Sequence, residues 1–221
     1  MLPALIPELI VEGACLKMID QLIIIVGVTI LVMISPGPDM VIVARNTMLG
    51  DRGDGLLTSA GVLTGNLVHI TYCAVGIGWL ISQSILAFSV LKYAGAAYLI
   101  YLGIMSIRAK TTPLQSISTG TRGGGRGYFL QGFLNNILNP KGTLFYLGVF
   151  TVVIDPQTSI GETVVLVITM MLVSAAFWLL FVYMLDRKAV REFFDKSQKA
   201  VNRIFGALLI VLGIRVAFLE R

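Results

Sequence analysis

Hydrophobic residues fall into long runs that short polar stretches separate. Six runs come close to or exceed the roughly 20 apolar residues that a membrane-spanning helix needs, and they cover residues 19–44, 56–82, 85–107, 128–150, 163–185 and 204–219. They are too long for the strands of an outer-membrane barrel, which have about ten residues of alternating polarity. The pattern therefore predicts an all-α integral membrane protein with six transmembrane helices.

Composition narrows the class of protein further. Of 221 residues, 56% are hydrophobic and only 13% are charged, which is about half the charged share of an ordinary soluble domain. Such a chain cannot cover a soluble fold with polar groups, and it is too hydrophobic for a disordered protein. The net charge of +5 does not indicate nucleic-acid binding, because the basic residues stand at the ends of apolar runs.

Basic residues also predict the orientation in the membrane. They gather in the loops after the first, third and fifth spans, namely Arg45, Arg52, Arg108, Lys110, Arg122, Arg126, Arg187, Lys188, Arg191, Lys196, Lys199 and Arg203. Loops rich in Lys and Arg stay on the cytoplasmic side of a membrane. We therefore expect these loops in the cytoplasm and both chain termini on the opposite side.

Two stretches outside the spans have a different character. Residues 1–17 lack the basic start and uninterrupted apolar core of a secretory signal, so we interpret them as an N-terminal extension that need not be structured, with Met18 as an alternative start. Residues 111–127 contain the sequence GTRGGGRG and are predicted to form a flexible basic linker. This linker separates two halves, 18–110 and 128–221.

The two halves resemble each other in two places. Pro36 and Pro140 correspond at an offset of 104, and residues 95–104 resemble residues 205–214 at an offset of 110. Because each half has three spans, the two copies must have opposite orientations, as in many secondary transporters. We expect two inverted three-helix repeats, unless the likeness reflects apolar composition alone.

The first span contains the sequence Ser35-Pro36-Gly37-Pro38-Asp39. Pro36 and Pro38 donate no backbone hydrogen bond, and their rings clash with the preceding turn, so the helix should break here. In lipid, the freed backbone groups must face protein or water. The break is therefore expected at an internal cavity, with a simple packed kink as the alternative.

A second break is expected in the fourth span, at residues 139–142 (NPKG). Pro140 frees the carbonyl group of Asn136, because proline has no N–H to bond it. Lys141 places an ammonium group within an apolar span, where ionisable groups usually face a cavity or a partner. The first and fourth helices are thus both predicted to be broken.

Asp39 and Lys141 occupy corresponding regions of the two halves. They either pair with each other or meet the two ends of a zwitterion, with Lys141 at the carboxylate and Asp39 at the ammonium group; the two ideas agree if substrate competes with the pair. Gln131, Asn135 and Asn139 are four residues apart and would share one helix face. We expect Asp39, Lys141, Asn135 and Asn139 to bind substrate.

His69 follows Gly61 and Gly65 in steps of four along the second span. Small residues allow close helix packing, so His69 is expected to face the interior of the bundle. It either relays protons, a role also open to Asp39, or serves as a hydrogen-bonded packing residue. One histidine and no carboxylate cluster leave too few ligands for a metal site, and no motif indicates a cofactor.

These motifs resemble those of the LysE/RhtB family of amino-acid exporters. The resemblance covers residues 18–219 and is carried by SPGPD, GVLTGNLVH, KYAGAAYLIYLGI and LNPKGTLFYLGVF. It implies that residues 36–39 belong to the first motif of the family and residues 139–141 to the second. Members often carry Asn at the place of Asp39, and an acid there is similar to the threonine and homoserine branch. The resemblance also implies efflux across the bacterial inner membrane, driven by the proton gradient.

The sequence thus favours a secondary transporter, not an enzyme, that exports a neutral or small polar amino acid such as threonine or homoserine. Its expected partners are that amino acid, protons and the lipid bilayer, and a homo-oligomer remains open. An uncoupled small-solute channel and a non-transport membrane scaffold are the alternatives. Buried Asp39 and Lys141 argue against a scaffold, which gains nothing from them.

Overall fold

The computed structural model describes residues 5–83, 85–109, 125–154, 157–185 and 187–218. These residues form eight helices and no strand, which confirms the predicted all-α class. The helices are α1 (Leu5–Ile34), α2 (Pro38–Leu49), α3 (Arg52–Gln83), α4 (Ile85–Arg108), α5 (Gly125–Ile137), α6 (Pro140–Val153), α7 (Ile160–Met184) and α8 (Lys188–Phe218).

Two pairs of helices, α1 with α2 and α5 with α6, are separated by two or three residues at prolines. Pro38 stands in the first turn of α2, and Pro140 stands in the first turn of α6. A proline is tolerated in that first turn because its missing N–H would have no partner within the helix. The interruptions fall where the prolines predicted them.

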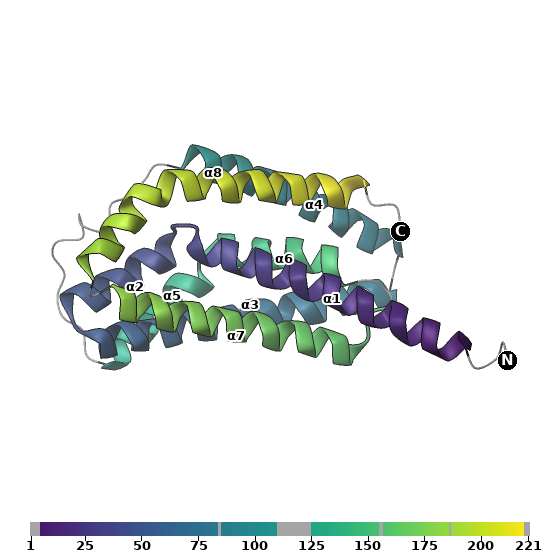
Figure 1. Ribbon diagram of the computed structural model, residues 1–221, viewed down its shortest axis with the longest axis horizontal. Helices are drawn as coiled ribbons and strands as arrows, with labels where there is room; N and C mark the ends of the chain where they lie inside the picture. The colour runs from purple at the N-terminus through teal and green to yellow at the C-terminus, as the bar shows by residue number, and fades with distance from the viewer. Residues whose placement is uncertain (1–4, 84, 110–124, 155–156, 186, 219–221) are drawn as a thin grey trace.

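Five of the described helices are long and apolar enough to cross a membrane: α1, α3, α4, α7 and α8. The predicted fourth span, 128–150, is divided between α5 with 13 residues and α6 with 14 residues. Neither half is long enough alone, since a crossing takes about 20 residues. In Figure 1, α5 and α6 follow each other along the long axis of the molecule.

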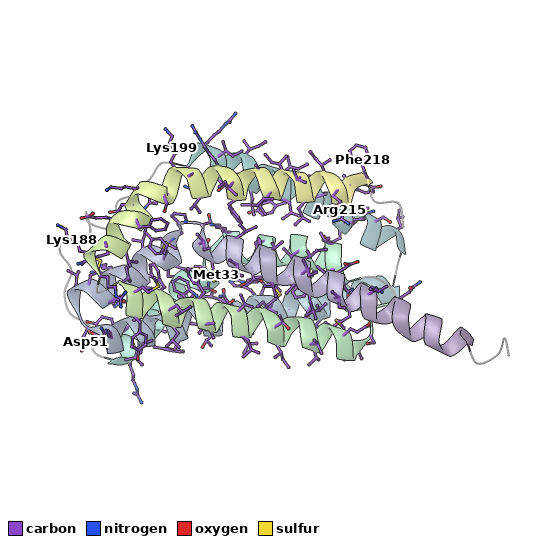
Figure 2. All side chains as sticks on the ribbon, viewed as in Figure 1. Met33, Asp51, Lys188, Lys199, Arg215 and Phe218 are labelled. Atoms are coloured by element: carbon purple, nitrogen blue, oxygen red, sulfur yellow. The ribbon has the colours of Figure 1, made fainter. Side chains whose placement is uncertain are left out.

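Figure 1 also shows the course of the chain. The helix pair α1–α2 runs away from the N-terminal end of the molecule, whereas α5–α6 runs back toward it. Asp51 and Lys188 lie toward one end of the molecule, and Arg215 and Phe218 lie toward the other end, on the side where α1 begins (Figure 2). The two broken helices therefore run in opposite directions, and both chain ends lie on one side.

The outer faces of the long helices are apolar. Val75, Leu172, Leu180 and Val211, which lie on the long helices α3, α7 and α8, expose between 60% and 67% of their surface. Large exposed apolar surfaces are unusual on soluble monomers and mark contact with a membrane or a partner. The exterior therefore fits a lipid environment.

Glycines bring α4 and α8 into backbone contact. A Cβ atom on Gly103 would lie 2.5 Å from the carbonyl oxygen of Gly206, and one on Gly213 would lie 2.7 Å from that of Ala96. At the sequence offset of 110, Ala96 corresponds to Gly206 and Gly103 corresponds to Gly213. The two contacts are therefore equivalent when the two antiparallel helices are exchanged.

A second close contact joins α3 to α5. Gly61 lies against the carbonyl group of Phe129, Gly132 lies against that of Thr58, and Gly65 lies against the side chain of Asn136. Small residues permit such close helix packing inside membranes. The contact carries the polar side chains of α5 into the interior of the bundle.

Two predicted segments lie at the limits of the described chain. The helix α1 begins at Leu5, so it includes part of the stretch 1–17 that the sequence set apart as an extension. Residues 111–124 of the predicted linker lie outside the described residues, and 125–127 form the first turn of α5. The division of the chain into two repeats and a linker stays a prediction.

Candidate functional site

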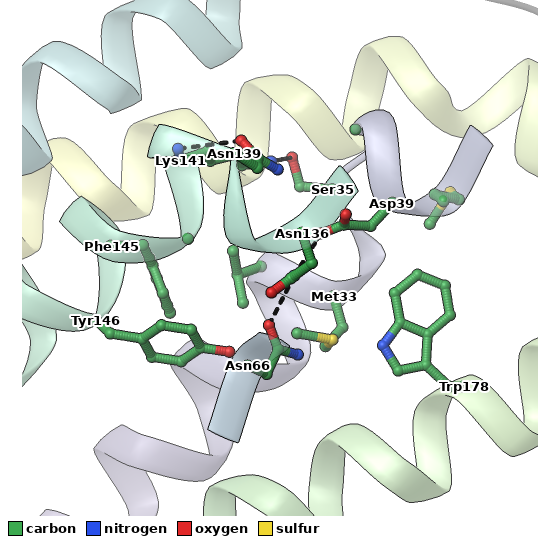
Figure 3. Close-up of a pocket in the computed structure, with 14 residues that line it drawn as sticks. Met33, Ser35, Asp39, Asn66, Asn136, Asn139, Lys141, Phe145, Tyr146 and Trp178 are labelled. Atoms are coloured by element: carbon green, nitrogen blue, oxygen red, sulfur yellow. Dashed lines mark hydrogen bonds between the residues drawn. The ribbon is translucent and has the colours of Figure 1, made fainter. Parts of the chain in front are cut away.

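A small cavity lies between the two helix breaks (Figure 3). The space that the centres of water molecules can reach is about 40 Å³, which is enough for a few waters. Apolar and polar side chains from both halves line it, among them Met33, Ser35, Asp39, Asn66, Asn136, Asn139, Lys141, Phe145, Tyr146 and Trp178. The breaks therefore face an internal cavity, as their freed backbone groups require.

The carboxylate of Asp39 is held by two amides of α5. Asn135 Nδ2 donates to Asp39 Oδ1 at 2.6 Å, and Asn136 Nδ2 donates to Asp39 Oδ2 at 2.9 Å. Asn136 is buried, with 1% of its surface exposed. Both carboxylate oxygens thus have neutral donors, which stabilise the charge without cancelling it.

Lys141 reaches the other break instead of the aspartate. Its Nζ donates to Ser35 Oγ at 3.2 Å and lies 5.3 Å from the centroid of the Phe205 ring. A cation over an aromatic face is attracted by the ring quadrupole. Within the described part of the chain, Lys141 and Asp39 form no direct ion pair. Asp39 and Lys141 therefore line the same cavity without bonding to each other.

The other polar residues predicted on α5 divide between two places. Asn135 contacts Asp39, whereas Gln131 Oε1 accepts from Asn46 Nδ2 at 3.2 Å. Asn139 does not share their helix face, because α5 ends at Ile137 and Asn139 caps α6, accepting from the backbone N–H of Lys141 at 3.1 Å. The expectation of a common face is therefore wrong for Asn139, although its side chain still lines the cavity.

His69 lies next to the second break but is not among the residues that line the cavity. Its Nε2 is 3.1 Å from the carbonyl oxygen of Asn136, which Pro140 cannot bond and which also accepts from the backbone N–H of Asn139 at 3.0 Å. Because that oxygen only accepts, Nε2 must carry a hydrogen. Nδ1 is then an acceptor, with Tyr72 OH at 2.7 Å and Thr143 Oγ1 at 3.0 Å, and these two hydroxyl groups are 2.7 Å apart.

Several cavity residues were not predicted from the sequence, among them Ser35, Asn66, Asn136 and Trp178. Asn136 Nδ2 also donates to Asn66 Oδ1 at 2.9 Å, which joins α5 to α3. Asn136 had a signal, since it stands four residues before Pro140. Asn66 lies within the motif GVLTGNLVH that carries the resemblance, but Trp178 had no signal, because only the packing of α7 brings it to the breaks.

Comparison with known proteins assigns the class. Apolar helices interrupted at a shared polar cavity are the architecture of a membrane transporter, and the family model described as LysE type translocator matches residues 30–219. The chain belongs to the LysE type translocator family. The protein is therefore a transporter rather than an enzyme.

Three relatives illustrate the range of the family. The chain is 31% identical over 206 residues to the uncharacterized membrane protein YrhP of Bacillus subtilis, covering 88% of this chain and 97% of that protein. It is 35% identical over 193 residues to a homoserine/homoserine lactone efflux protein of Salmonella typhimurium (85% and 91% covered). It is 28% identical over 202 residues to a leucine efflux protein of Salmonella choleraesuis (89% and 93% covered). No solved structure matches the chain.

Proposed function

We propose that this protein exports a neutral or small polar amino acid, such as threonine or homoserine, across the bacterial inner membrane in exchange for protons. The observation that carries the proposal is the separation of Asp39 from Lys141 on one cavity. A zwitterion offers an ammonium group to the acid and a carboxylate to the base. The names of the relatives, for homoserine and for leucine efflux, support an amino acid as the solute.

In this proposal Asp39 carries the proton. Its carboxylate lines the cavity and can bind either the ammonium group of the substrate or a proton, but not both. Substrate would bind the ionised carboxylate from the cytoplasm, and a proton would replace it on the outer side. Competition for one carboxylate thus couples outward movement of the amino acid to inward movement of the proton. His69 donates a hydrogen bond to the backbone carbonyl group of Asn136 next to the second break. In this proposal it does not exchange protons.

Two inverted repeats would supply the change of access. The support is the pair of equivalent contacts between α4 and α8 and the opposite course of the two broken helices. Inverted repeats exchange their conformations when the substrate site of a transporter changes from facing one side of the membrane to facing the other. The placement of basic residues further supports both termini on the outer side.

A transport assay tests the proposal. Purified protein in lipid vesicles should accumulate labelled homoserine or threonine when a pH gradient is imposed, and a protonophore should abolish accumulation. Overproduction should also let cells tolerate inhibitory levels of that amino acid and lower its internal pool. Transport that ignores the pH gradient would favour a channel or another driving ion. No movement of any amino acid across a broad panel would favour the scaffold alternative.

A further inference from the structure

The cavity wall opposite the charged groups contains two buried donors that lack acceptors. Trp178 Nε1 and Asn66 Nδ2 have no hydrogen-bond partner among the described residues, and neither has the acceptor Asn136 Oδ1, although Trp178 is only 3% exposed and Asn66 only 2%. Buried polar groups nearly always find a partner. Two such donors on one cavity therefore require an explanation.

The orientation of the Asn66 amide follows from its neighbours. An ionised Asp39 carboxylate only accepts, so the nitrogen of Asn136 must face it. The same nitrogen donates to Asn66, which requires the oxygen of Asn66 at that contact. The nitrogen of Asn66 is therefore the end left free, and it is a donor.

Trp178 reaches the cavity from α7 as the sole representative of that helix among the lining residues. Its ring is fixed by edge contacts with Phe177 and Phe181, whose centroids lie 5.3 and 5.8 Å away. In Figure 3 the side chain of Met33 is drawn between the indole nitrogen of Trp178 and the amide nitrogen of Asn66. Asp39 and Lys141 come from the breaks and line the opposite part of the cavity.

The charged groups of a bound amino acid would therefore contact Asp39 and Lys141 at the breaks. Its side chain would contact the wall that contains Trp178 and Asn66. Met33 and Phe145 contribute apolar surface to this wall, and Trp178 Nε1 and Asn66 Nδ2 are donors on it without a partner among the described residues. A site with unpaired donors disfavours a ligand that lacks the matching oxygen, because the donors then stay unsatisfied.

We propose that Trp178 Nε1 and Asn66 Nδ2 are specificity contacts that donate hydrogen bonds to an oxygen atom on the substrate side chain. The transporter then prefers amino acids with a side-chain hydroxyl or carbonyl oxygen over aliphatic ones of the same shape. This inference rests on the proposed function and names the substrate class of the same site.

Isosteric pairs of substrates test the proposal. Homoserine and norvaline differ by one hydroxyl against one methyl group, as do threonine and valine. In counterflow with full-length protein in vesicles, the wild type should favour the hydroxyl-bearing member of at least one pair by about fivefold or more. Trp178→Phe keeps an aromatic ring and removes the donor. It should reduce the preference to about twofold or less, by weakening transport of the hydroxyl-bearing member while the aliphatic member is unchanged.

A matched control lies one turn away on the same helix. Ser174 also has a buried oxygen without a partner among the described residues, but it does not line the cavity. Ser174→Ala should leave the preference unchanged. Because the preference is a ratio measured on one sample, it does not depend on how much protein folds.

Fluorescence gives a second measurement that does not require transport. Trp178 is one of two tryptophans in the chain, so in a Trp79→Phe background its emission should change on titration with homoserine and not with norvaline. Equal loss of both substrates in Trp178→Phe, or a wild-type preference for the aliphatic members, would overturn the inference and leave the proposed function standing. Failure of the wild type to move any amino acid would overturn both.

Discussion

The Nε2 atom of His69 lies 3.1 Å from the carbonyl oxygen of Asn136. This contact supplies a second donor to a carbonyl group that Pro140 cannot bond and that the backbone N–H of Asn139 reaches at 3.0 Å. His69 is 1% exposed, and its other ring nitrogen contacts the hydroxyl groups of Tyr72 and Thr143. The histidine therefore stabilises the end of α5 at the break.

Substitution of His69 separates this role from proton transfer. His69→Gln keeps a donor near the carbonyl group and should retain uptake driven by a pH gradient. His69→Ala removes one of the two donors to the carbonyl and should lower stability by about 0.5–1.5 kcal/mol, measured by thermal unfolding in detergent. If His69→Gln kept counterflow but its transport no longer responded to the pH gradient, His69 and not Asp39 would be the residue that carries the coupled proton.

Asp39→Asn should uncouple transport from the proton gradient. The substitution removes the group that exchanges a proton for the substrate ammonium, and it places a further amide beside those of Asn135 and Asn136. Gradient-driven accumulation should disappear, and counterflow should fall by at least about tenfold, as expected for loss of a charged contact worth about 1.5–3 kcal/mol. Asp20→Asn, on the exposed face of α1, is the control and should behave like wild type.

Lys141→Ala should abolish export while the protein still reaches the membrane. It removes the cation proposed for the substrate carboxylate and leaves Ser35 without its donor. Ser35→Ala removes only the 3.2 Å hydrogen bond to Lys141 and should weaken apparent affinity by about 2–10-fold. A double variant, Asp39→Ala with Lys141→Ala, that transports like wild type would show that neither charge belongs to the site.

Gly103→Ala should destabilise the contact of α4 with α8. The added Cβ atom would lie 2.5 Å from the backbone oxygen of Gly206, and such overpacking costs about 1–3 kcal/mol. Gly76→Ala is the matched control, because nothing lies within 4 Å of its Cβ position; it should be neutral or slightly stabilising. Equal unfolding temperatures for the two variants would argue against close packing at Gly103.

Labelling of single cysteines checks the orientation. In a background with Cys15→Ser and Cys73→Ser, Gln157→Cys should react with an impermeant reagent in intact cells. Ala109→Cys should react only after the membrane is permeabilised, because its loop is rich in basic residues. Both positions are exposed in the structure, so access does not limit the reaction. The reverse pattern would place both termini in the cytoplasm.

Proline chemistry made the breaks predictable from sequence, since Pro36, Pro38 and Pro140 act on their own backbone whatever surrounds them. The glycines at 61 and 65 likewise predicted a close contact between helices. The partners of Lys141 and Asp39 were not predictable, because Ser35 and Asn136 reach them only through packing between distant helices. Nothing in the sequence marked Trp178 as a site residue, because aromatic residues are common on apolar helices. Only its position beside the cavity distinguishes it.

The glycine contacts between α4 and α8 join the first half of the chain to the second without help from the peptide that connects them. Covalent continuity between the halves should therefore be dispensable once both are in the membrane. Two separately expressed polypeptides, 1–110 and 125–221, are expected to assemble and co-purify, and Gly103→Ala should weaken that assembly. Each half would then be a subunit in its own right, and the transporter a heterodimer held by the crossing of two helices.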